Sequence, residues 1–181
     1  GGVWLLIAGL LTMLLHQPYD LLISEDAKRV AYRLPDNRWV MVRGEPDSFE
    51  AQQWWRINAV DMAMTRKQAL KENIAGFRCN KSTCLIERDA TDIVVAIRKS
   101  DSDWLCDSGA DIIISDRVVG RGDCHKISHV IDRDFVEVHG AVGIRFADDI
   151  VIDTSYGLRG RWPWTKQKLV ETEDGATMPS E

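Results

Sequence analysis

The sequence lacks a hydrophobic run of the about 20 residues that a membrane-spanning helix needs. Its N-terminal apolar stretch, residues 3–15, is shorter than that, and no charged residue precedes Asp20. The positive leader and the small-residue cleavage site of a secretory signal are also missing. We therefore interpret residues 1–19 as the end of a transmembrane helix, and expect its first turns in a preceding part of a larger membrane protein.

An excess of positive charge is lacking as well. The 181 residues contain 23 Lys and Arg against 28 Asp and Glu, a net charge of -5. Phosphate binding depends on clustered cations, so this balance argues against a nucleic-acid clamp formed by the whole domain, and any such contact must be local. The contents of 45% hydrophobic and 28% charged residues are ordinary for a folded chain. We predict one soluble domain over residues 20–168 and a disordered acidic tail over residues 169–181.

Recognisable catalytic and metal-binding motifs are missing too. The spacing assembles no Ser-His-Asp or Cys-His arrangement, and the chain has no His-x-His-x-Asp-His motif. We therefore predict no catalytic residue, no metal ligand and no cofactor. One alternative stays open, because Asp123, His125, His129 and Asp132 lie close in sequence and could serve a hydrolase. Gly122 and nearby β-branched residues argue against the helix that the His pair would need to bind a metal.

Short segments rich in apolar residues alternate with turn formers over most of the chain, which predicts a domain with more strand than helix. Asp47 and Glu50 have capping-box spacing and predict one helix, over residues 47–58. Residues 65–72 are interpreted as a second helical or irregular stretch on the surface, and residues 101–108 as a short helix or turn. The expected class is α+β, mostly β-sheet with one good helix. The predicted strands are residues 20–24, 29–34, 39–42, 77–79, 84–88, 93–98, 110–115, 135–139, 142–146 and 150–154, with hairpins at 29–42 and around Gly140 and Ala141.

A near-continuous apolar run surrounds Ile112, Ile113 and Ile114. A strand without polar alternation must be covered on both faces. We therefore predict that this strand is the central one of the sheet. The indoles are the largest side chains available to cover it, so Trp54 or Trp55 is expected to pack nearby.

The chain has four cysteines: Cys79, Cys84, Cys106 and Cys124. An even number fits two disulfides in a domain outside the cytosol. The short separation of Cys79 and Cys84 suits a bridge across a hairpin, and a Cys106–Cys124 bridge would stabilise by roughly 3 kcal/mol. A zinc site and free buried thiols are the alternatives, although only the first pair resembles a zinc knuckle.

Residues 157–168 hold four cations and two Trp without an acid. Aromatic rings interleaved with cations can stack on bases and neutralise phosphates of a single strand. The same composition can lie at a membrane interface, or the Trp side chains can pack back on the domain. The candidate contacts with nucleic acid or membrane are Arg159, Arg161, Trp162, Trp164, Lys166 and Lys168.

Several of these features, taken in order, resemble the C-terminal domain of ComEC-type DNA-internalisation proteins, in the form found in Alphaproteobacteria. The resemblance covers residues 3–164. One departure is Thr83, because such sequences tend to carry Gly before the second cysteine. The segments that carry the resemblance are residues 22–33, Phe49 and Trp54 in the helix, Cys79 and Cys84, Cys106, residues 111–115, Cys124, residues 131–133, Gly140 and Ala141, and residues 159–164.

Many members of this family have a metallo-β-lactamase-like domain at this end. Residues 80–85 and 93–97 resemble a core β-pair of that fold, and residues 111–115 resemble the strand that leads into its His-His-Gly-Ser metal motif. Residues 116–119 stand in the place of that motif. The resemblance therefore implies a reduced, metal-free relative of the lactamase fold, or an unrelated α+β domain in the same position.

The resemblance implies a non-catalytic accessory domain of a membrane channel for DNA uptake in natural transformation. It places the chain at the bacterial inner membrane, with the soluble domain in the periplasm. The expected partners are the upstream transmembrane segment of the same protein, the membrane, single-stranded DNA and other uptake components. Two alternatives remain, a metal-dependent nuclease acting on incoming DNA and a protein-interaction module of the uptake machinery.

Overall fold

The computed structural model describes residues 17–88, 90–97, 102–119, 126–146 and 149–159, together with Trp4 and Cys124. Trp4 is helical and exposed, but the rest of the helix expected at residues 3–15, and the tail at residues 169–181, lie outside the described residues. No helix within the described ranges is long and apolar enough to cross a membrane.

The first sheet has six strands and is mostly antiparallel. The predicted hairpin at residues 29–42 is confirmed, and it turns at Asn37, which has a φ of 67°. The last pair is parallel and joins Met41 to Thr65. The strands lie in the order β11 (Ile150–Thr154), β10 (Val142–Phe146), β1 (Leu21–Ile23), β2 (Val30–Arg33), β3 (Trp39–Arg43) and β4 (Met64–Thr65).

The second sheet has five strands in sequence order. Its first three strands are antiparallel neighbours, and the last three pair in parallel. They are β5 (Phe77–Cys79), β6 (Thr83–Arg88), β7 (Thr91–Ala96), β8 (Ile112–Ile114) and β9 (His129–Ile131).

The two sheets share one hydrophobic core. Alternate side chains of each strand face this core, as the two-residue period of a strand requires. The first sheet contributes Leu21, Tyr32 and Val42, among others, and the second contributes Ile86 and Ile114. The domain is therefore an α+β protein made mainly of two packed sheets.

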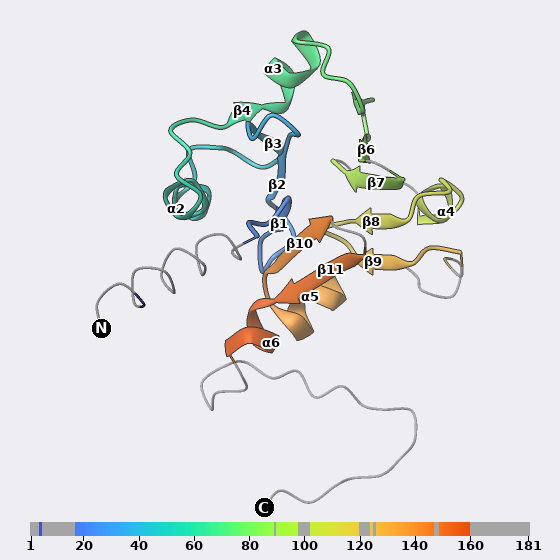
Figure 1. Ribbon diagram of the computed structural model, residues 1–181. Helices are drawn as coiled ribbons and strands as arrows, with labels where there is room; N and C mark the ends of the chain where they lie inside the picture. Colours follow the sequence, from blue (N-terminus) through green and yellow to red (C-terminus); the bar gives the residue numbers. More distant parts are fainter. Residues whose placement is uncertain are drawn as a thin grey trace, which may run out of the picture.

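A helix packs on part of the outer face of each sheet, and the two helices lie on opposite sides of the domain (Figure 1). On the first sheet, Trp55 of α2 (Phe49–Ile57) packs on Trp39, with ring centroids 6.0 Å apart. On the second sheet, Leu105 of α4 (Ser102–Cys106) packs with Ile113. Three further helices are α3 (Arg66–Lys71), α5 (Arg133–His139) and α6 (Ser155–Arg159).

The predictions for the isoleucine strand are partly confirmed. Ile112, Ile113 and Ile114 are fully buried, with neighbours on both sides. The strand is not the central one, because β7 occupies the middle of the five-stranded order. The prediction for the indoles is wrong. Trp54 and Trp55 belong to the cluster outside the first sheet, so the shared core and α4 cover the isoleucines instead.

The predicted strand at residues 135–139 is also wrong, because this segment is helix α5. Asp132 caps its N-terminus by accepting a hydrogen bond from the Phe135 N–H. Gly140 ends it with a φ of 78°. The alternating apolar residues that suggested a strand divide between Val136, which is buried in the core, and Val138, which is exposed.

The helix predicted at residues 47–58 is confirmed as α2, but its N-cap is Ser48 rather than Asp47. The Ser48 hydroxyl accepts from the Ala51 N–H. Of the stretch at residues 65–72, residues 66–71 form helix α3, which begins at a reciprocal capping box of Thr65 and Gln68. The expectation of one good helix is therefore too low.

Both predicted disulfides are present. Cys79 bridges Cys84 across β5 and β6, with 4.0 Å between their Cα atoms. Cys106, at the end of α4, bridges Cys124 with 4.7 Å between Cα atoms. The four sulfurs form two separate pairs, so the alternatives of a zinc site and of free thiols are wrong.

Candidate anion-binding cleft

The basic segment predicted to contact nucleic acid or membrane lies almost wholly outside the described residues. Of the six candidate contacts, only the backbone of Arg159 is described, at the end of α6, so its predicted role stays a prediction too. The predictions for Arg161, Trp162, Trp164, Lys166 and Lys168 stay predictions.

The residues considered for a hydrolase do not form a described site. Asp123 and His125 lie outside the described residues. His129 lies on β9 beside a mostly apolar cavity of about 300 Å³. No group of three or more His, Cys, Asp and Glu side chains within the described ranges is placed to hold a metal ion.

Asp132 has a structural role in this arrangement. Its side chain is buried, and one carboxylate oxygen accepts from the Phe135 N–H at 2.9 Å. The other accepts from the Val119 N–H, also at 2.9 Å. Both oxygens thus fix the start of α5 and the loop after β8, which leaves the carboxylate poorly placed to serve as a base or a metal ligand.

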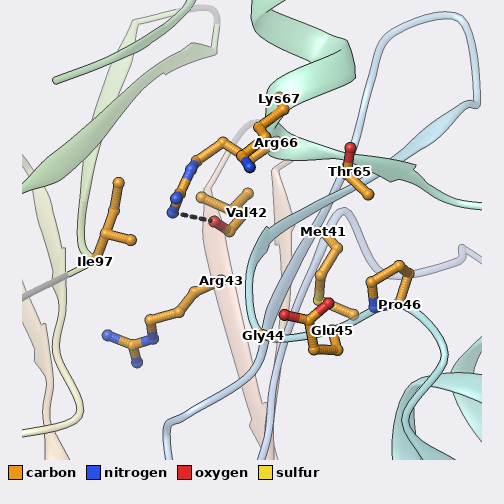
Figure 2. Close-up of a pocket in the computed structure, with 10 residues that line it drawn as sticks. All are labelled: Met41, Val42, Arg43, Gly44, Glu45, Pro46, Thr65, Arg66, Lys67 and Ile97. Atoms are coloured by element: carbon orange, nitrogen blue, oxygen red, sulfur yellow. Dashed lines mark hydrogen bonds between the residues drawn. The ribbon is translucent and has the colours of Figure 1, made fainter. Parts of the chain in front are cut away.

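A different group of functional side chains lines a cleft of about 420 Å³ (Figure 2). We name it the Arg43 cleft. It lies where the end of β3 meets the start of α3 and the residue after β7. Its lining residues are Met41, Val42, Arg43, Gly44, Glu45, Pro46, Thr65, Arg66, Lys67 and Ile97.

The parallel pairing of β3 with β4 builds this cleft. Met41 lies opposite Thr65, so the capping box at Thr65 starts α3 directly beside β3. Arg66 and Lys67 follow in the first turn of that helix. The Arg66 guanidinium donates to the Val42 carbonyl at 3.3 Å. Two neighbouring cationic residues are thereby held next to the end of the strand.

Arg43 is the most unusual side chain of the cleft, because it is a cation only 7% exposed. Its Nη1 donates to the carbonyl of Ala96, which ties β3 to the end of β7. Its ionic partner is Asp116 at 3.5 Å. The Nε and Nη2 atoms are enclosed and have no hydrogen-bond partner among the described residues. Burial lowers the pKa of the Arg43 guanidinium, and the charges of Asp116 and Asp26 oppose this effect.

The charges that line the cleft are mainly positive. Arg43, Arg66 and Lys67 are cations, and the described residues of the lining contain one carboxylate, that of the exposed Glu45. Charge of this kind in a partly enclosed space favours an oxyanion ligand. Figure 2 shows the Arg43 and Arg66 side chains extending toward the same side as Ile97.

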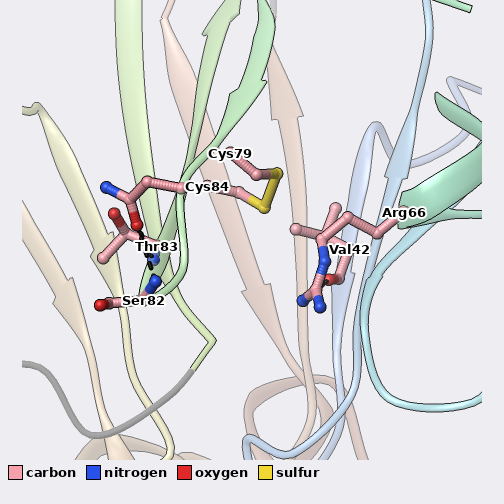
Figure 3. Close-up of a disulfide and its surroundings, with 7 residues drawn as sticks. Val42, Arg66, Cys79, Ser82, Thr83 and Cys84 are labelled. Carbon is pink, nitrogen blue, oxygen red and sulfur yellow. Dashed lines mark hydrogen bonds between the residues drawn. A yellow bond between two sulfur atoms is a disulfide. The ribbon is translucent and has the colours of Figure 1, made fainter. Parts of the chain in front are cut away.

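The first disulfide lies beside this region. Figure 3 shows the Cys79–Cys84 bridge facing Val42 and Arg66. Cys84 is fully buried and belongs to the shared core together with Val42. The bridge therefore fixes the part of the second sheet that lies opposite the cleft residues.

Sequence reasoning missed this site. Residues 65–72 were expected to lie on the surface, and no local pattern links Arg43 to Arg66. The link comes from a parallel pair of two-residue extent between segments that α2 separates. A basic pair directly after the Thr65 capping residue was the available signal, but it does not specify the neighbouring strand.

Comparisons of the chain with models of protein families, with curated proteins and with solved structures found no match. The fold and the bridges thus define the chain as a disulfide-bonded α+β domain of two sheets. The resemblance of the sequence to ComEC-type proteins stays a prediction.

Proposed function

We propose that this chain is the extracytoplasmic accessory domain of a ComEC-type channel for DNA uptake in natural transformation. It acts without catalysis of its own, at the outer side of the bacterial inner membrane. The observation that carries the proposal is the pairing of all four cysteines, which are among the residues that resemble the family.

The bridges support the location because disulfides persist in oxidising compartments such as the periplasm and are rare in the cytosol. The Cys106–Cys124 bridge links α4 to the segment before β9, and the Cys79–Cys84 bridge links two neighbouring strands. Both bridges therefore stabilise the second sheet and the helix α4 that packs on it.

We further propose that the domain is a reduced relative of the metallo-β-lactamase fold. This proposal is supported by the antiparallel pairing of β6 with β7, at the segments that resemble a core pair of that fold. In place of the family's metal motif, Asp116 pairs with Arg43. Asp132, on which a hydrolase would depend, binds two backbone N–H groups. These contacts favour an accessory role over the nuclease alternative.

The test is transformation by a naturally competent host whose channel carries this domain. A channel that lacks residues 20–168 is expected to lose most transformation, while remaining in the inner membrane at an unchanged level. Electroporated plasmid bypasses uptake, so its yield should not change. Undiminished transformation by the deleted channel would contradict the proposal.

A further inference from the structure

We propose that the Arg43 cleft binds a phosphodiester group of single-stranded DNA. The identity of the strand rests on the proposed function, and the oxyanion chemistry rests on the cleft itself. The described residues that line this site are not those of the basic segment at residues 157–168.

The first argument is the state of Arg43. Within the part of the chain that the structure describes, two nitrogens of the buried Arg43 guanidinium are unpaired. Its desolvation cost is then offset only in part by one hydrogen bond and one partly exposed carboxylate. An anion in the cleft would stabilise this charge, because charges interact more strongly where water is excluded. Since the unpaired nitrogens are enclosed, Arg43 attracts the ligand through its charge and not through direct contact.

The contacts with the ligand come from the start of α3. Lys67 is exposed and Arg66 is half-buried, so both reach the cleft from a rigid helix turn. The Arg66 guanidinium already donates to the Val42 carbonyl, but arginine has five N–H donors, so the same group can also bind phosphate oxygens. Lysine adds a mobile point charge. Glu45, at the exposed side of the same cleft, disfavours a second anion and favours one phosphate at a time.

The size of the cleft favours a strand over a small ion. Its volume of about 420 Å³ lies in the range of sites for organic ligands, roughly 300–1,000 Å³, and exceeds what one phosphate fills. Met41, Pro46 and Ile97 provide apolar surface beside the cations. A phosphate at Arg66 and Lys67 would leave room there for its sugar or base. None of these residues offers base-specific recognition, so binding should be insensitive to sequence.

The test uses the full 181-residue chain in a non-ionic detergent and a fluorescein-labelled oligo(dT), followed by fluorescence anisotropy at low salt. Arg66→Ala and Lys67→Ala should each weaken binding roughly tenfold, as expected for loss of a charged hydrogen bond. The slope of log affinity against log salt should become shallower by about 0.7 for each lost phosphate contact. Circular dichroism should show that both variants keep the fold.

Lys71→Ala is the matched control, because Lys71 lies on the same helix but does not line the cleft. It should leave the affinity nearly unchanged. Equal losses from Lys67→Ala and Lys71→Ala would show a diffuse charge effect and overturn the proposal. The proposal would also be overturned if the cleft variants bind normally and Arg161→Ala abolishes binding, since the contact would then lie in the C-terminal basic segment.

Competition with inorganic phosphate distinguishes a phosphodiester of DNA from a free phosphate ion as the natural ligand. Competition by phosphate only at high concentration, with tight oligonucleotide binding, supports the phosphodiester. Protection of the folded chain by phosphate without oligonucleotide binding would overturn it in favour of a free ion. The transformation assay tests the proposed function independently. If the domain deletion abolishes transformation but the cleft variants bind the oligonucleotide normally, only this site is rejected. If the cleft binds the strand but the domain deletion leaves transformation normal, only the uptake role is rejected.

Discussion

Arg43 carries a structural conflict at the scale of a single residue. Its hydrogen bond to Ala96 ties the two sheets together, yet two of its nitrogens are buried and find no partner in the described ranges. An apolar residue of similar length would fill the same space without this desolvation cost. Residues that break a local rule in this way are often retained for function, which agrees with a role in ligand attraction.

We predict that Arg43→Met changes stability little, because the desolvation cost that it removes offsets the lost hydrogen bond to Ala96, and because Asp116 is 37% exposed and stays hydrated without its partner. Asp116→Asn should lower stability by about 1 kcal/mol, because the guanidinium then loses its ionic partner. Urea unfolding measures both, with Asp107→Asn as the control at an exposed carboxylate. A large loss of stability in Arg43→Met would show that the guanidinium is needed as a clamp between the sheets.

Residue patterns alone predicted the disulfides but not the cleft. The cysteine pairs could be predicted because each pair is close in sequence and the chemistry allows few pairings. Arg43 and Arg66 are separated by a helix and a loop, and their proximity depends on the pairing of β3 with β4. That pairing involves two residues on each strand, which is too little to leave a periodic signal.

At the scale of the element, α5 shows how a short amphipathic segment can be mistaken for a strand. In a segment of only seven residues, the helical period and the strand period place many of the same side chains on the buried face. The capping residues contained the missing information, because Asp132 and Gly140 are a typical start and end of a helix. Most strands of both sheets were predicted, since turn formers bound them, but β4 and β9 were missed.

We predict that Gly140→Ala destabilises the domain by at least about 2 kcal/mol. Its φ of 78° and ψ of -158° lie in a region that is costly for any residue with a Cβ. The added Cβ would also lie 2.1 Å from Ser155 Oγ, at the start of α6. Gly109→Ala is the matched control, because its φ is 72° but no atom lies within 4 Å of the added Cβ. Similar losses in both variants would show that backbone strain, and not the contact with α6, sets the cost.

At the scale of the whole molecule, the two sheets form one structural unit. Side chains from both sheets make up a single core, so neither sheet can be separated without exposing it. Both disulfides, however, lie in the half of the domain that contains the second sheet. This uneven distribution allows the unity of the fold to be tested.

We predict that reduction of both disulfides destabilises the first sheet as much as the second. The bridges close loops with sequence separations of 5 and 18 residues, and the loop-entropy model gives about 5 kcal/mol for the two together. Because the core is shared, this loss should apply to global unfolding, in which both sheets open together. Hydrogen exchange followed by mass spectrometry measures it, by comparing peptides from β2 and β3 with peptides from β6 and β7. The chain with all four cysteines replaced by Ala serves as a control for the reductant. Loss of protection confined to β6 and β7 would show that the sheets unfold separately, and the single-unit description would then be wrong.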